Sequence, residues 1–130
     1  MTVALVPEFV LRDVAAKLAD YRYMFASEVQ LHEGMAEVLS HHGIAHEREK
    51  ALDSRNRVDF WLTDFAMVIE VKVDGSLGEA ARQVGRYCAL ETVKGVLLAS
   101  TKPWARQPLK TRPTMSGKAF HMVHLRRQSL

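Results

Sequence analysis

Two short alternating stretches, separated by four residues, most constrain what this chain can fold into. Residues 57–62 read R-V-D-F-W-L, and residues 67–73 read M-V-I-E-V-K-V. Both alternate as β-strands do, because successive side chains of a strand point to opposite faces of the sheet. The intervening segment, Thr63-Asp64-Phe65-Ala66, has the length of a hairpin loop. The sequence therefore predicts an antiparallel β-hairpin over these residues.

The register of this hairpin follows by counting outward from its loop. If Leu62 pairs with Met67, Asp59 falls opposite Glu70. The pairs between these two are Trp61 with Val68 and Phe60 with Ile69. Two carboxylates that face each other across a sheet repel and destabilise it. A positive group is therefore expected between the two acids.

The alternation also predicts which side chains share a face. Glu70 and Lys72 project from one face of their strand, and the apolar residues between them project from the other. In the preceding strand, Asp59 is expected on the face opposite to Val58 and Phe60. A divalent cation is the natural partner for the two acids, with Lys72 beside it. Mg²⁺ suits such a site, since it binds through few carboxylates and keeps several waters.

The rest of the chain predicts an α/β fold with a central mixed β-sheet of about five strands flanked by helices. Ser27 is expected to cap a helix over 28–41, and Gly43 follows the end of that helix. The strand over 95–100 is apolar throughout, which indicates a buried strand parallel to 67–73 through a right-handed crossover. The other expected elements are helices over 7–25 and 77–92, strands over 44–52 and 119–125, and a loop over 101–117.

Length and composition indicate one soluble domain. The chain has 130 residues, with 18 Lys and Arg against 15 acids and a net charge of +3, which permits a polyanionic partner. Cys88 is the single cysteine and excludes an intrachain disulfide. No apolar run has the length of a membrane helix, and no signal peptide is evident, so a cytoplasmic protein is expected. Residues 1–26 are expected to form a helical extension to a core domain over 27–130.

Two further polar residues are candidates for the site. Glu28 falls within the apolar arc of its helix, where a carboxylate needs a partner or a metal, although it could simply favour the helix N-terminus. Gln83 lies on the shoulder of the apolar arc of the helix over 77–92, so it either reaches the site or is solvated. On that same helix, Arg82 and Arg86 are either solvated charges or phosphate contacts.

The histidines and tryptophans carry weaker signals. His41, His42 and His46 straddle the end of a predicted helix and match no zinc-ligand spacing. Trp61 is expected to pack against a helix, whereas Trp104 lies in a basic loop and is a candidate for contact with nucleic acid. The basic residues expected to bind nucleic acid with Trp104 are Lys102, Arg106, Lys110 and Arg112.

The order of these motifs resembles the PD-(D/E)XK nuclease superfamily, in particular its small phage and bacterial members. The resemblance covers residues 27–125, with Val58 where the name-giving proline would stand. It rests on Ser27-Glu28, Gly43-Ile44, Glu47-Arg48-Glu49, Arg57-Val58-Asp59-Phe60, Ile69-Glu70-Val71-Lys72-Val73 and Gln83-Val84-Gly85-Arg86-Tyr87.

This resemblance implies metal-dependent hydrolysis of phosphodiester bonds by a restriction-endonuclease-like core. It implies that Asp59 and Glu70, with help from Glu28, bind Mg²⁺ or Mn²⁺. It also implies that Lys72 activates water or stabilises developing charge, and that Gln83 assists. Many members of this size cut branched DNA as homodimers, so a DNA endonuclease of that kind is the leading hypothesis. The alternative is a catalytically idle nuclease-fold module that binds nucleic acid or a partner protein.

Overall fold

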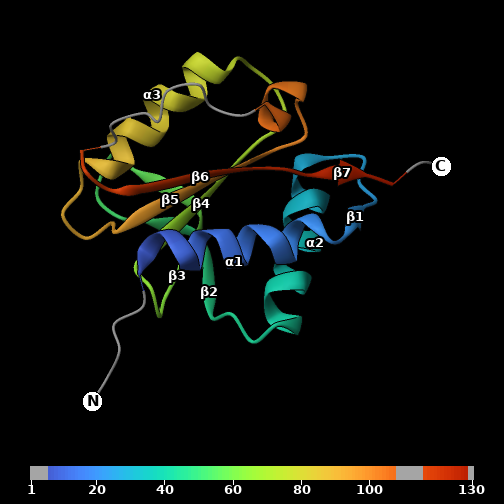
Figure 1. Ribbon diagram of the computed structural model, residues 1–130, viewed down its shortest axis with the longest axis horizontal. Helices are drawn as coiled ribbons and strands as arrows, with labels where there is room; N and C mark the ends of the chain where they lie inside the picture. The colour runs from blue at the N-terminus through green and yellow to red at the C-terminus, as the bar shows by residue number, and fades with distance from the viewer. Residues whose placement is uncertain (1–5, 108–115, 129–130) are drawn as a thin grey trace.

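The computed structural model describes residues 6–107 and 116–128. Within them, a mixed five-stranded sheet is flanked by three α-helices, which confirms the predicted α/β class (Figure 1). The helices are α1 (Pro7–Ala19), α2 (Glu28–His41), α3 (Leu77–Cys88) and a short 3₁₀ helix, η1 (Pro103–Arg106). The strands are β1 (Arg22–Tyr23), β2 (His46–Ala51), β3 (Arg57–Leu62), β4 (Met67–Lys72), β5 (Gly95–Ser100), β6 (Ala119–His124) and β7 (Arg126–Arg127).

The sheet changes from antiparallel to parallel at its central strand. Its order is β2-β3-β4-β5-β6, with antiparallel pairing from β2 to β4 and parallel pairing from β4 to β6. The predicted parallel crossover from β4 through α3 to β5 is confirmed, and every residue of β5 is buried. β1 and β7 form a separate parallel pair outside this sheet.

Local sequence determines several of the element ends. The predicted cap of α2 is confirmed, because Ser27 Oγ accepts a hydrogen bond from Gln30 N. The helix α1 ends at Ala19 rather than near residue 25, so the predicted helix was too long. The chain turns there because Tyr23 is buried and its hydroxyl donates to the carbonyl of Leu18, in the last turn of α1.

The helix α3 is also shorter than predicted, because it ends at Cys88 rather than near residue 92. Beyond its end, the ammonium of Lys118 donates hydrogen bonds to the carbonyls of Leu90 and Val93. A cation from a distant part of the chain thus binds carbonyls of the segment that follows the helix.

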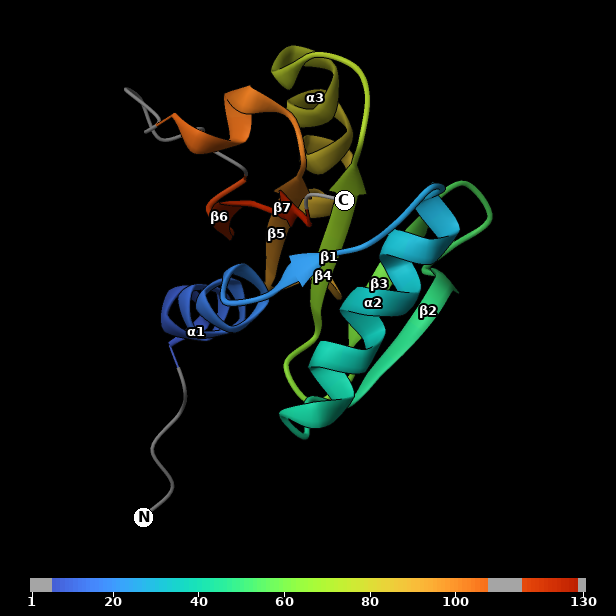
Figure 2. The same ribbon diagram turned by 90° about the vertical axis from the view of Figure 1, so that its right-hand side faces the viewer.

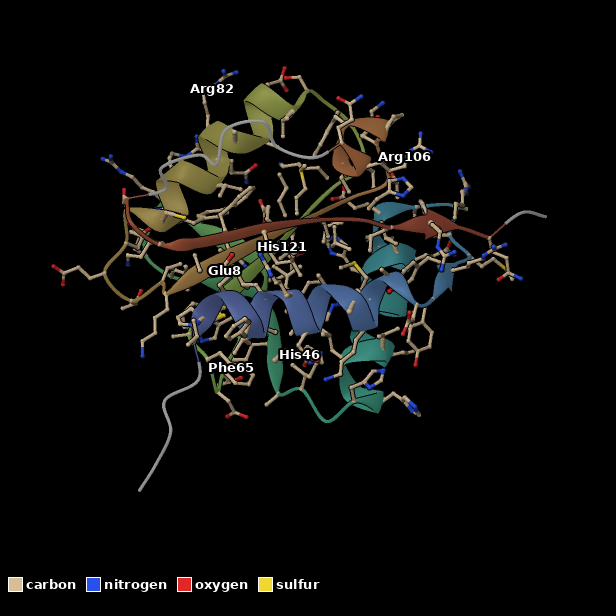
Figure 3. All side chains as sticks on the ribbon, in the orientation of Figure 1. Glu8, His46, Phe65, Arg82, Arg106 and His121 are labelled. Atoms are coloured by element: carbon tan, nitrogen blue, oxygen red, sulfur yellow. The ribbon has the colours of Figure 1, made fainter. Side chains whose placement is uncertain are left out.

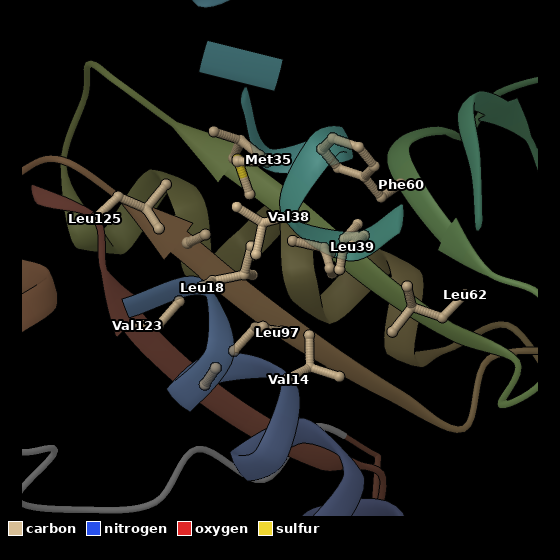
Figure 4. Packing of buried hydrophobic residues seen from close by; sticks show 14 of the residues in the cluster. Val14, Leu18, Met35, Val38, Leu39, Phe60, Leu62, Leu97, Val123 and Leu125 are labelled. Atoms are coloured by element: carbon tan, nitrogen blue, oxygen red, sulfur yellow. The ribbon is translucent and has the colours of Figure 1, made fainter. Parts of the chain in front are cut away.

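Two hydrophobic clusters lie on opposite faces of the sheet. One is formed between α1, α2 and the sheet, and the other between α3 and the sheet. Figure 1 shows α3 and α1 on opposite sides of the strands, and Figure 2 shows α2 in front of β3 and β4. In the first cluster, Leu18 of α1, Leu39 of α2 and Leu97 of β5 point toward a common centre (Figure 4). The N-terminal helix therefore shares its core with the sheet.

None of the helices in the described ranges is long and apolar enough to cross a membrane.

Close contact between β5, β6 and α1 requires a glycine at position 95. A Cβ atom added to Gly95 would lie 3.2 Å from both the Cβ and the carbonyl oxygen of Ala119, and 3.3 Å from Leu11 Cδ1. We expect Gly95→Ala to lower the free energy of unfolding by about 1–3 kcal/mol, because backbone must shift to admit the methyl group. Gly85→Ala is the matched control, since nothing lies within 4 Å of its added Cβ.

The control should raise the free energy of unfolding by about 0.5–1 kcal/mol, as alanine is the better helix former. Both values come from urea denaturation. Equal stability of Gly95→Ala and the wild type would show that the β5–β6–α1 contact is looser than described.

Candidate metal centre

The β3–β4 hairpin opens at Asp59 and Glu70. The predicted pairs Leu62–Met67, Trp61–Val68 and Phe60–Ile69 are all confirmed, and the paired ladder stops there. At the next position, the side chains of the two acids accept backbone N–H groups that are no longer paired between the strands. Asp59 N–H donates to Glu70 Oε1 at 3.3 Å, and Val71 N–H donates to Asp59 Oδ2 at 2.7 Å. The two carboxyl groups therefore lie close together at the point where β3 and β4 separate.

The strand β3 also twists at Asp59. Val58 packs in the cluster under α3, whereas Phe60 packs in the cluster under α1 and α2. The prediction that both lie on the face opposite Asp59 is therefore wrong. The cause is that Asp59 is bridged to neither adjacent strand, so its backbone is released from regular alternation. Across from it on β2, Glu49 adopts a left-handed φ of 51°, which is rare for such a residue.

Glu70 is an almost fully buried acid, with 3% of its surface exposed. Burial, and then the adjacent Asp59 carboxylate, raise the pKa of Glu70 to about 8, although the nearby Lys72 ammonium acts to lower it. At neutral pH Glu70 therefore holds a proton in the metal-free protein. A cation at the two carboxyl groups would favour the ionised form and displace that proton.

A relay from α3 holds the other oxygen of Glu70. The Tyr87 hydroxyl lies 3.0 Å from Glu70 Oε2 and 3.1 Å from the Arg57 carbonyl, and it accepts a hydrogen bond of 2.7 Å from Gln83 Nε2. Burial, and then the charge of Glu70, raise the pKa of Tyr87, so its hydroxyl stays a donor. Gln83 thus acts on Glu70 through Tyr87. Sequence reasoning gave Tyr87 no role of its own at the site, although it lies one helical turn after Gln83.

Lys72 lies on the same strand face as Glu70 and is half-buried. Its backbone carbonyl accepts a hydrogen bond from Ser100 Oγ at 2.6 Å, which fixes the end of β4 against β5. Within the described part of the chain, the Lys72 ammonium has no hydrogen-bond or ion-pair partner. It is nevertheless close enough to Glu70 to influence its pKa. A positive charge is thus held beside the acid pair without being neutralised by a partner.

A second set of donors approaches Asp59 from α2. One side-chain donor atom from each of Glu28, His32 and Asp59 lies within 4.8 Å of the others, so this group could hold a metal ion. His32 Nε2 is 3.6 Å from Glu28 Oε1. Sequence reasoning identified Glu28 but missed His32. The available signal was its position four residues after Glu28, which places both on one helical face.

Asp59 belongs to both groups of acids. The sequence predicted Glu28, Asp59 and Glu70 as metal ligands. In the structure Glu28 and His32 reach Asp59 from α2, whereas Glu70 is held against Asp59 from the neighbouring strand. The pair of carboxyl groups and the group from α2 therefore form one continuous polar centre around Asp59.

The residues predicted to contact nucleic acid lie on several elements. Arg82 and Arg86 are exposed on α3, Arg106 is exposed at η1, and Lys102 is half-buried. Figure 3 shows Arg82 and Arg106 on the side of the sheet that α3 covers. Trp104 is half-buried and its indole N–H donates to the Gly75 carbonyl at 3.1 Å, which ties η1 to the loop before α3. Lys110 and Arg112 lie outside the described residues.

Comparison of the chain with protein-family models, with curated proteins and with solved structures gave no match. The chemistry of the centre therefore has to be argued from its own residues.

The raised pKa of Glu70 predicts how the stability of the metal-free protein depends on pH. Its folded-state pKa of about 8 lies above the ordinary value of 4.5, so the folded protein binds this proton more tightly than the unfolded chain does. The resulting stabilisation is complete below the unfolded pKa and is lost as the pH rises through the folded one. Relative to Glu70→Gln, the wild type should therefore lose thermal stability as the pH rises from about 5 to about 8.

Thermal unfolding in the presence of a chelator measures this difference. Glu79→Gln, which replaces an exposed acid in the first turn of α3, is the matched control and should follow the wild type. Parallel pH curves for the wild type and Glu70→Gln would show that Glu70 ionises normally in the folded protein.

Proposed function

We propose that this protein is a metal-dependent nuclease that hydrolyses DNA phosphodiester bonds with Mg²⁺ or Mn²⁺ at Asp59. The observation that carries the proposal is the buried Glu70 carboxyl, hydrogen-bonded to the backbone of Asp59 and accompanied by the Lys72 ammonium, which acts on its pKa. Two acids held together in a low-dielectric setting repel when both are ionised. In the metal-free protein the proton on Glu70 relieves that repulsion, and a divalent cation would take the place of this proton.

The residues of the centre divide the chemistry between them. A bound divalent cation would neutralise the phosphate charge and lower the pKa of a coordinated water. Asp59 and Glu28 would hold that cation, and the ionised carboxylate of Glu70 would add a negative charge next to Asp59. Lys72 would stabilise the negative charge that develops on the phosphoryl oxygens in the transition state. Gln83 would position Glu70 through the Tyr87 hydroxyl.

Exposed arginines on two elements support a polyanionic substrate. The exposed arginines Arg82, Arg86 and Arg106 lie on α3 and η1 and would contact DNA phosphates. We propose branched or otherwise structured DNA as the substrate and a homodimer as the active species. Twofold pairing is the commonest oligomer symmetry.

Substitution of Lys72 should separate catalysis from binding. We expect Lys72→Ala to lower kcat for cleavage of a four-way-junction DNA by about 10²–10³-fold, because its charge acts on the transition state. Its affinity for metal and DNA should change little. Lys94→Ala, an exposed lysine just before β5, is the matched control and should cleave normally. Cleavage and binding are measured with Mn²⁺ on single-stranded, duplex, flap and junction DNA and on RNA.

Asp59→Asn should abolish cleavage in the same panel while leaving the protein folded. The reason is that Asp59, which belongs to both groups of acids, would lose the negative charge that holds the cation. Full activity of this variant would contradict the assignment of the centre. A wild type that binds DNA but cuts none of these substrates would instead support the idle binding module.

The arginines of α3 should control affinity for DNA in a salt-dependent way. We expect the double variant Arg82→Ala and Arg86→Ala to weaken binding and to reduce the slope of log affinity against log salt by about two. Arg12→Ala is the control, because Arg12 is an exposed arginine on α1 that pairs with Glu8. Fluorescence anisotropy at several salt concentrations measures both quantities. An unchanged slope in the double variant would place the DNA elsewhere.

A further inference from the structure

We propose that His32 is a direct metal ligand and makes the centre select a first-row transition ion, such as Mn²⁺, over Mg²⁺. This inference deepens the proposed function and rests on it only for the presence of a cation at Asp59. It does not require that the bound ion be used to cut DNA.

The imidazole of His32 has an unmet hydrogen-bonding capacity. The residue is 5% exposed, and its Nε2 atom is buried with no hydrogen-bond partner among residues 6–107 and 116–128. Buried polar nitrogens without partners are uncommon, because each costs about 1–3 kcal/mol of desolvation. This nitrogen lies 3.6 Å from Glu28 Oε1, and His32 belongs to the group with Asp59. The imidazole therefore lies beside the place where the carboxylates of Glu28 and Asp59 converge.

The other side of the ring is oriented as in a metal-binding histidine. His32 Nδ1 lies 3.9 Å from Glu49 Oε1, on the side away from Nε2. A histidine that binds a metal through one nitrogen commonly directs the other toward a carboxylate, which fixes the tautomer. With the proton on Nδ1, Nε2 is free to donate its lone pair. Glu49 is itself the residue of β2 with a left-handed φ. Its backbone carbonyl accepts a hydrogen bond from Arg57 Nη1 at 3.0 Å.

An aromatic contact limits rotation of the ring. The centroids of His32 and Phe60 are 5.6 Å apart, and their planes are tilted by 54°. Phe60 is itself fully buried under α2 and directly follows Asp59. The same strand therefore positions both a carboxylate ligand and the surface that holds the imidazole.

The donor set determines the preferred ion. Mg²⁺ binds oxygen ligands and keeps several waters, whereas imidazole nitrogen suits transition metals. In a set of two carboxylates and one imidazole, the bond to the imidazole nitrogen therefore strengthens the binding of a transition ion more than the binding of Mg²⁺. Mn²⁺ accepts both oxygen and nitrogen donors and is the probe of choice, since its unpaired electrons report the ligating nitrogen directly.

Two measurements on the full-length protein test this assignment. Pulsed electron paramagnetic resonance of bound Mn²⁺ should show a ¹⁴N coupling in the wild type that is absent in His32→Gln. Calorimetric titrations should show that His32→Gln weakens Mn²⁺ binding about tenfold or more and Mg²⁺ binding much less, so that the Mn²⁺/Mg²⁺ affinity ratio falls.

His46→Gln is the matched control. His46 also contacts Phe60, at a centroid distance of 5.8 Å, but its Nδ1 lies 2.9 Å from the Ile44 carbonyl and it is not in the metal-binding group. This variant should keep both the coupling and the affinity ratio. Glu49→Gln tests the positioning residue and should weaken Mn²⁺ binding while the ¹⁴N coupling persists.

The wild-type spectrum decides the question even if His32→Gln does not fold. Bound Mn²⁺ without a ¹⁴N coupling, or an unchanged affinity ratio in a folded His32→Gln, would overturn the assignment. A ¹⁴N coupling lost in His32→Gln would support it even if the protein cleaves no DNA, in which case only the nuclease proposal fails. Cleavage with no ¹⁴N coupling would be consistent with the nuclease proposal and would contradict the assignment of His32 as a ligand.

Discussion

The reciprocal hydrogen bonds between Asp59 and the β4 segment at Glu70 and Val71 are the interaction on which the centre depends. Each acid accepts a backbone N–H from the opposite strand, at the position where the ladder of β3 and β4 ends. The side chains thus replace ladder bonds that the diverging strands no longer make. This arrangement keeps two carboxyl groups together in a buried setting, and it opens the sheet at the same position.

The two faces of the sheet supply different partners to this opening. From one face, α2 brings Glu28 and the buried His32 to Asp59. From the other face, α3 brings Tyr87 and Gln83 to Glu70. Because each helix is fixed by a hydrophobic cluster, packing brings these polar residues to the opening, where hydrogen bonds orient Tyr87 and Gln83 toward Glu70. A rigid centre of this kind has little freedom to separate its charges, and a cation is the simplest way to compensate them.

Those parts of the centre that depend on local pattern could be predicted from sequence. The alternation of residues 57–73 predicted the strands and the register that brings Asp59 to Glu70, and the Ser27 cap fixed the start of α2 and hence the position of Glu28. The parts that depend on tertiary contacts could not. The twist at Asp59 requires the loss of pairing to both neighbouring strands, which no periodicity reports.

The same limit explains the two residues that sequence reasoning missed. A histidine on the core side of a helix is compatible with packing alone, and only the approach of Asp59 and Glu49 gives His32 a chemical role. Tyr87 fits an apolar arc by spacing, and only the position of β4 shows that its hydroxyl reaches Glu70. Both lie one helical turn from a residue that the sequence did indicate.

The central claim is that Asp59 and Glu70 form a cation site whose charge is balanced by a proton when no metal is bound. It is tested most directly by calorimetric titration of Mn²⁺ at about pH 7 in two buffers of different ionisation enthalpy, which counts the protons released. Since burial and the neighbouring Asp59 raise the pKa of Glu70, binding should release more protons per ion in the wild type than in Glu70→Gln. Failure to bind Mn²⁺, or binding with the same proton count in both proteins, would contradict the claim.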